Sequence, residues 1–65
     1  MPQTYGPLIK AKLKDNGCYF ARQGKGDHEI WFSPLTNRYL TVDNGTKSRH
    51  TANAVMKQAG IDYRF

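Results

Sequence analysis

Two groups of turn-forming residues divide the centre of this chain into three short segments that are typical of β-strands. Gly24–Asp27 is a hairpin-type turn, and Pro34–Asn37 is a second turn. The segments that they separate, residues 18–23, 28–33 and 39–42, alternate apolar and polar side chains. Because both turns are short, we expect the three strands to pair antiparallel in chain order.

A predicted helix precedes the strands. Gly6-Pro7 begins it, because proline is suited to the first helical position, and Gly17 is placed to end it in a left-handed conformation. Its apolar stripe consists of Leu8, Ile9 and Leu13. Lys12 lies within this stripe on the helical wheel, so either its stem extends outward or the apolar face is imperfect there.

A second predicted helix follows the strands. Ser48 is a candidate N-cap, and Gly60 ends the helix. Its apolar face repeats at helical spacing: Ala52, Val55, Met56 and Ala59. The tail, residues 61–65, either folds back onto the core or meets a partner. We therefore expect residues 1–65 to form one α+β domain of order α-β-β-β-α. Both helices would cover one face of a three-stranded antiparallel sheet, as in double-stranded RNA-binding domains.

Size and charge limit the possible functions. A chain of 65 residues can form one layer of sheet against one layer of helix, so we expect no small-molecule cofactor inside it. Its net charge of +5 favours nucleic acid as a partner. A basic surface that serves solubility, or one that binds an acidic protein, is the alternative.

The chain has one cysteine, Cys18, so no intramolecular disulfide can form, and this suits a cytoplasmic protein. We expect neither a signal peptide nor a membrane span, because the N-terminus is polar and no apolar run is long enough. Cys18, His28 and His50 lack zinc-like spacing, so no metal site is expected. Cys18 is expected to be a buried thiol rather than a nucleophile paired with His28.

His28 is the strongest candidate for a catalytic residue. It begins the second predicted strand directly after a glycine-rich turn that contains Lys25, and Arg22 precedes that turn. Histidine changes its charge near neutral pH, and neighbouring cations favour an anionic substrate. This combination predicts phosphodiester chemistry at His28, with an ordinary surface histidine as the alternative.

Further candidate RNA contacts lie at the second predicted helix. Lys47 and Arg49 lie at its beginning, where a helix N-terminus beside cations favours anions. His50 and Lys57 share a polar stripe that could contact RNA phosphates or 2′-hydroxyls. A solvated helix face is the alternative for that stripe.

Lysines of the first helix and two aromatic residues of the strands are additional candidates. Lys10 and Lys14 share one side of their helix and could extend a phosphate track, although solubility alone would also explain them. Trp31 and Tyr39 are expected on the sheet face away from the helices, where they would stack on bases or bind a protein. Burial against neighbouring strands is the alternative, since a one-residue slip in register reverses the face.

From about residue 8 to residue 61 the chain resembles the HicA family of bacterial toxin mRNA interferases. Four segments carry the resemblance: Leu8–Lys10, Gly17–Gln23, Gly24–Trp31 and Ser48–Ile61. The third contains the family's Gly-x-His motif, and the fourth matches the closing helix and its glycine. Many members have serine or threonine before the histidine and a second histidine after it, where this chain has Asp27 and Glu29. Lys12 stands where a leucine is more expected.

The resemblance implies a metal-independent endoribonuclease that cleaves mRNA and is neutralised by a HicB-type antitoxin. His28 would act as general base or acid toward a ribose 2′-hydroxyl, yielding a 2′,3′-cyclic phosphate and a 5′-hydroxyl. Arg22 and Lys25 would stabilise charge on the phosphoryl oxygens. Two alternatives are a non-catalytic RNA-binding module of the same fold and a protein that binds only an acidic protein partner.

Overall fold

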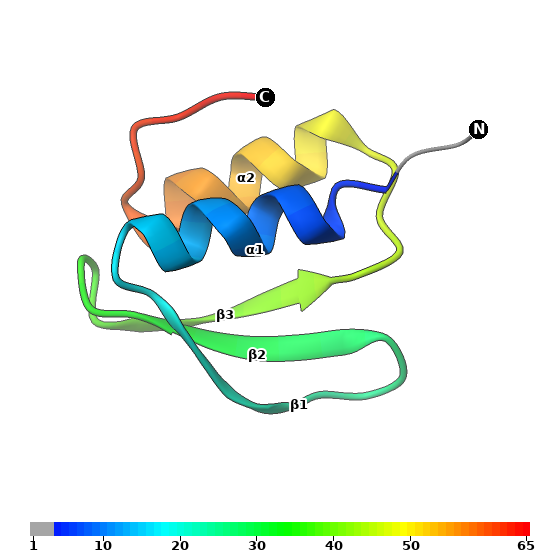
Figure 1. Cartoon of the computed structure of the whole chain (residues 1–65), viewed down its shortest axis with the longest axis horizontal. Coiled ribbons are helices and arrows are strands. Elements are labelled where there is room, and N and C mark those ends of the chain that lie inside the picture. The colour runs from blue at the N-terminus through cyan, green and yellow to red at the C-terminus, as the bar shows by residue number, and fades with distance from the viewer. Residues whose placement is uncertain (1–3) are drawn as a thin grey trace.

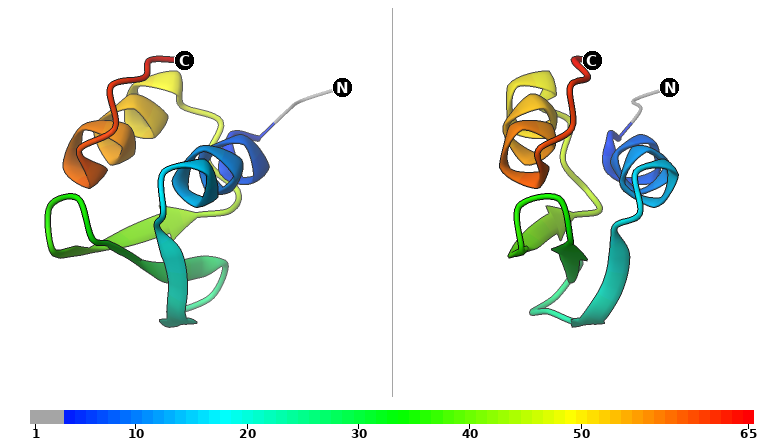
Figure 2. Two further views of the ribbon diagram at one scale, coloured as in Figure 1. Left: turned by 60° about the vertical axis from the view of Figure 1, so that its left-hand side comes forward. Right: turned by 90° about the vertical axis from the view of Figure 1, so that its left-hand side faces the viewer.

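The computed structural model describes residues 4–65, so residues 1–3 of the predicted 1–65 domain and its polar N-terminus lie outside the described part. The elements are α1 (Gly6–Asp15), β1 (Tyr19–Gln23), β2 (His28–Ser33), β3 (Arg38–Asp43) and α2 (Arg49–Ala59). This order confirms the predicted α-β-β-β-α arrangement. The strands form one antiparallel sheet in the order β1-β2-β3. Both helices lie on one face of it (Figure 1), and no described element covers the opposite face, called the bare face below (Figure 2).

The helix ends follow the predicted capping residues. Gly17 has a φ of +82° and follows Asn16, the C-cap of α1, whereas Gly60 has a φ of +78° and is itself the C-cap of α2. Glycine adopts this left-handed conformation without the steric penalty that a Cβ would bring. The Ser48 hydroxyl accepts a hydrogen bond from the Thr51 backbone N–H at 3.2 Å, which confirms Ser48 as the N-cap of α2.

The hydrophobic core lies between the sheet and the two helices. The sheet contributes Trp31, Leu40 and Val42, and the helices contribute Ile9, Leu13, Ala52, Val55, Met56 and Ala59. Ser33 at the end of β2 is also fully buried, and its hydroxyl donates a hydrogen bond to the Ala59 carbonyl at 2.7 Å. This bond ties the C-terminal end of α2 to the sheet.

The apolar face of α1 is narrower than predicted. Ile9 and Leu13 are fully buried, but Leu8 is 49% exposed, so its assignment to the core was wrong. Ile9 and Leu13 are four residues apart and therefore lie on the same side of the helix. Leu8 is one residue before Ile9, so its side chain points away from that side. Lys12 extends outward over the aromatic ring of Tyr63, with Nζ 4.0 Å from the ring centroid.

The C-terminal segment folds back onto the molecule, as one of the two alternatives predicted. The Phe65 backbone N–H donates a hydrogen bond to Asn53 Oδ1 at 2.6 Å. The Phe65 ring packs against the core and meets the Tyr5 ring edge-on at a centroid separation of 5.5 Å.

Strand β1 differs most from its prediction. Alternation of apolar and polar side chains is typical of a strand with one buried face, yet every residue of β1 is exposed. The physical reason is that β1 is an edge strand, while both helices pack against β3 at the other edge. A β-bulge between Phe20 and Arg22 further disturbs its pairing with β2.

The register of β2 also corrects the prediction for Trp31. Its indole is 2% exposed and lies in the core, so it cannot stack on a base at the bare face. Tyr39 is 68% exposed and pairs with Phe32, which alternates with Trp31 along β2. Tyr39 therefore does lie on the face away from the helices, as predicted.

Candidate active site

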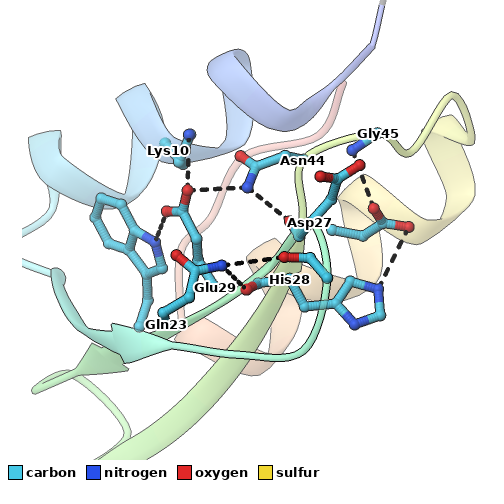
Figure 3. A network of polar contacts seen from close by, with 10 residues as sticks. Lys10, Gln23, Asp27, His28, Glu29, Asn44 and Gly45 are labelled. Atoms are coloured by element: carbon cyan, nitrogen blue, oxygen red, sulfur yellow. Dashed lines mark hydrogen bonds and ion pairs between the residues drawn. The ribbon is translucent and has the colours of Figure 1, made fainter.

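His28 lies on the bare face, at the end of the sheet where β2 begins and β3 ends. Cross-strand pairing places it opposite Asp43, the last residue of β3. The His28 Nε2 atom lies 3.8 Å from the Asp43 Oδ2 atom (Figure 3), which is an ion pair when the imidazole is protonated. About half of the His28 side chain is exposed, so the ring is accessible to a substrate. Asp43 was missed in the sequence because only the strand register brings it to His28.

Hydrogen bonds from β1 hold the turn that carries His28. The His28 carbonyl accepts hydrogen bonds from the Gly24 backbone N–H and from Gln23 Nε2, both at 2.9 Å. Gln23 Nε2 also donates to the Gly26 carbonyl at 3.2 Å (Figure 3). Gly26 has a φ of +62°, a conformation that favours glycine at this position of the turn.

The connection between β3 and α2 holds the same turn from the other side. Asn44 donates two hydrogen bonds to the Asp27 carbonyl, one from its backbone N–H at 3.2 Å and one from Nδ2 at 2.7 Å. Asn44 Nδ2 also donates to Glu29 Oε2 at 2.9 Å. The backbone on both sides of His28 is therefore fixed by neighbouring segments, which restricts where its imidazole can lie.

Glu29 points to the helix-covered face, away from His28. Its carboxylate accepts hydrogen bonds from Trp31 Nε1 at 2.9 Å, Asn44 Nδ2 at 2.9 Å and Lys10 Nζ at 3.3 Å (Figure 3). The hydrogen bond from Trp31, then that from Asn44, and then the hydrogen bond and charge of Lys10 lower the pKa of Glu29, against an opposing effect of burial. The charge of Glu29 is thus paired with Lys10 and lies on the opposite face of the sheet from the His28 imidazole.

The β-bulge in β1 brings Arg22 to the bare face. Before the bulge Phe20 pairs with Trp31, and after it Arg22 pairs with Ile30, two residues from His28 along β2. A diagonal neighbour of this kind has its Cβ about 7–8 Å away, within reach of a long side chain. Lys25 lies in the turn itself, and its carbonyl accepts the His28 backbone N–H at 3.1 Å. The fold therefore places two of the predicted cations, Arg22 and Lys25, on segments next to His28.

The remaining predicted contacts lie elsewhere on the surface. The connection between β3 and α2 lies at the same end of the molecule as the turn between β1 and β2 (Figure 1), but Lys47 and Arg49 line a separate hollow beside Leu8. His50 and Lys57 line another hollow along the exposed side of α2.

Cys18 is buried and free, as predicted, and it takes no part in the surface around His28. Within residues 4–65, no group of three or more histidine, cysteine or acidic side chains is arranged to hold a metal ion.

Comparison with known families decides the relationship that the motifs indicated. The family profile for HicA toxins of bacterial toxin–antitoxin systems matches residues 8–61 of the 65-residue chain. The chain belongs to the HicA toxin family. It is thus a toxin whose partner is an antitoxin, and His28 with its turn lies inside the matched region. No curated protein and no solved structure matches this chain. Across residues 4–65, no helix of this HicA toxin has the length and apolar character needed to cross a membrane.

Proposed function

We propose that this HicA toxin is a metal-independent endoribonuclease that cleaves mRNA, with His28 as its general base and acid. The observation that carries the proposal is the position of the His28 imidazole. It is half-exposed on the bare face, with the Asp43 carboxylate 3.8 Å away and Arg22 diagonally across the neighbouring strand. The backbone that holds His28 is anchored by hydrogen bonds from Gln23, Gly24 and Asn44.

The proposed reaction needs one proton acceptor that later becomes a donor. Neutral His28 takes the proton from a ribose 2′-hydroxyl, and the 2′-oxygen attacks the adjacent phosphorus. The bond from phosphorus to the 5′-oxygen breaks, and that oxygen takes the proton back from the imidazolium. The products are a 2′,3′-cyclic phosphate and a 5′-hydroxyl. A single positioned histidine contributes about 10²–10⁴-fold to such a reaction.

The neighbouring charges have distinct roles in this proposal. The Asp43 carboxylate stabilises the positive charge that His28 acquires during the reaction, because the two groups are already at ion-pair distance. Arg22 and Lys25 stabilise the negative charge that develops on the phosphoryl oxygens. The charge of Glu29 does not oppose this, because Lys10 pairs with it on the other face.

We further propose that a HicB-type antitoxin neutralises the toxin by covering His28. If the substrate is mRNA, the toxin acts in the cytoplasm, and the free thiol of Cys18 is consistent with a reducing compartment. The parts of the RNA beyond the cleavage point would be held by Lys47, Arg49, His50 and Lys57. No small-molecule cofactor enters the proposed reaction.

The test is cleavage of a defined mRNA by the purified protein in the presence of EDTA. We expect the native chain to release fragments with cyclic-phosphate ends and His28→Ala to release none. Because the His28 side chain is half-exposed, the free energy of unfolding of His28→Ala should stay within about 0.5 kcal/mol of the native value. A thermal unfolding measurement therefore separates lost chemistry from lost folding. Equal cleavage by both proteins would refute the proposal.

Two other outcomes would each support a different function. Salt-sensitive RNA binding without cleavage by either protein would indicate a non-catalytic RNA-binding module. The absence of any salt-sensitive affinity for RNA would indicate a surface that binds only an acidic protein.

A further inference from the structure

Three aromatic side chains form a continuous row across the bare face, one from each strand. Tyr19 of β1 pairs with Phe32 of β2, and Phe32 pairs with Tyr39 of β3. The ring centroids of Tyr19 and Phe32 lie 5.6 Å apart, and those of Phe32 and Tyr39 lie 5.1 Å apart. Tyr19 is 55% exposed and Tyr39 is 68% exposed. A contiguous exposed apolar patch on a small domain usually marks a binding surface.

The aromatic row and His28 occupy the same face at opposite ends of β2. Phe32 and His28 are four residues apart along the strand, a distance of about 13 Å at the usual rise per residue. Arg22 lies between them, because it pairs with Ile30 midway along β2. The face therefore presents aromatic rings at one end of β2 and the imidazole at the other, with Arg22 on the neighbouring strand beside the stretch between them.

We propose that the aromatic row is a stacking platform for unpaired bases of a single-stranded RNA whose scissile phosphate lies at His28. The inference rests on the proposed ribonuclease function and deepens it, since it specifies the substrate as unpaired RNA. At about 3.4 Å per stacked nucleotide, the 13 Å gap spans about four nucleotides, and an extended strand would cross it with fewer. The bases that stack therefore lie within about four nucleotides of the cleaved bond.

The chemistry of the face favours RNA over a protein as the occupant. Arg22 lies on β1 beside the path from the row to His28, and the whole chain carries a net charge of +5. Aromatic rings combined with a positively charged path are the usual means of binding single strands without strong sequence preference. Binding to duplex RNA by shape and phosphate contacts would not use these rings, because paired bases are not available for stacking on them.

The experiment compares Tyr39→Leu with Tyr39→Phe in the full chain. Tyr39 is the most exposed ring of the row, so neither change should disturb folding. Binding is measured by fluorescence anisotropy on a labelled RNA of 2′-O-methyl nucleotides, which lacks the 2′-hydroxyl nucleophile and cannot be cleaved. We expect Tyr39→Leu to weaken binding of the single strand by about 5- to 150-fold, the usual loss when one stacking ring is removed. Tyr39→Phe keeps the ring and should bind within about twofold of native.

Three further results separate this inference from the proposed reaction. Annealing the complementary strand should remove the difference between Tyr39→Leu and native, because the bases are then paired. If the native chain cleaves RNA but Tyr39→Leu binds the single strand as tightly as native, the platform is refuted and the ribonuclease stands. If His28→Ala cleaves as well as native while Tyr39→Leu still weakens binding, the reaction is refuted and the platform stands.

Sedimentation of the same variants tests a second copy of the chain as occupant. A native dimer that dissociates in Tyr39→Leu, with unchanged affinity for the RNA probe, would assign the face to self-association and overturn the inference.

Discussion

Removing the Glu29 carboxylate should destabilise the domain more than its partly exposed position indicates. Trp31 is 2% exposed, and its indole N–H donates to Glu29 Oε1 at 2.9 Å. In Glu29→Ala that donor loses its acceptor inside the core, which costs about 1–3 kcal/mol. Asn44 keeps its hydrogen bond to the Asp27 carbonyl, so it loses less, and Lys10 regains water. We expect a total loss of about 2–4 kcal/mol.

This loss is large for a domain of 65 residues, whose free energy of unfolding is about 3–10 kcal/mol. Thermal unfolding followed by circular dichroism should show a fall in Tm of at least about 8 °C for Glu29→Ala. Glu29→Gln is the matched control, because its amide oxygen can still accept from Trp31, and we expect it to lose only about 1 kcal/mol. If the free energy of unfolding of Glu29→Ala lies within about 0.5 kcal/mol of the native value, the hydrogen bonds to Glu29 do not stabilise the domain in the way argued.

The lowered pKa of Glu29 adds a dependence on pH. Because the pKa of Glu29 is lower in the folded state than in the unfolded state, its ionised carboxylate stabilises the fold. This contribution to the free energy of unfolding is fully present above about pH 4.3, the ordinary pKa of glutamate. It is lost as the pH falls from there through the folded pKa. The stability difference between native and Glu29→Gln should therefore shrink between about pH 6 and about pH 3. A difference that stays constant over this range would contradict the assignment of the hydrogen-bonded carboxylate.

Two further predictions concern the turn and its cations. Arg22→Gln should slow cleavage of RNA. It should also reduce the slope of the logarithm of the binding constant against the logarithm of the salt concentration by about 1, as expected for the loss of one phosphate contact. Titrations of the RNA at four salt concentrations would measure this slope. Gly24→Ala would place a Cβ 3.0 Å from the His28 carbonyl oxygen, so the start of β2 must shift. We expect it to reduce kcat for RNA cleavage more than it weakens binding of the uncleavable probe, and an equal effect on both would argue against a role in positioning His28.

The elements of this fold could be predicted because each local signal agrees with the final structure. Proline and glycine mark the ends of α1, Ser48 and Gly60 mark the ends of α2, and short turns separate three strands. Such signals depend on neighbouring residues alone. For this reason the strand His28–Ser33 and the last helix were predicted with the boundaries that the structure has.

Contacts that depend on register could not be predicted in the same way. The pairing of His28 with Asp43 and the burial of Trp31 both follow from which residues face one another across strands. A shift of one residue would reverse every side chain of a strand, and nothing within a single strand excludes it. The exposure of β1 is likewise decided by the helices, which pack on the far edge of the sheet.

The bulge in β1 connects these failures of prediction to the proposed function. With regular alternation, Phe20 and Arg22 would share a face, and Arg22 would point toward the helices, away from His28. The bulge adds one residue between them, so Phe20 pairs with Trp31 while Arg22 pairs with Ile30 on the bare face. Tyr19 and Arg22, both exposed, then contribute to the surface proposed to bind RNA. Because β1 buries little, changes at its outward side chains should affect RNA binding far more than folding, whereas changes at the buried Leu40 and Val42 of β3 should do the reverse.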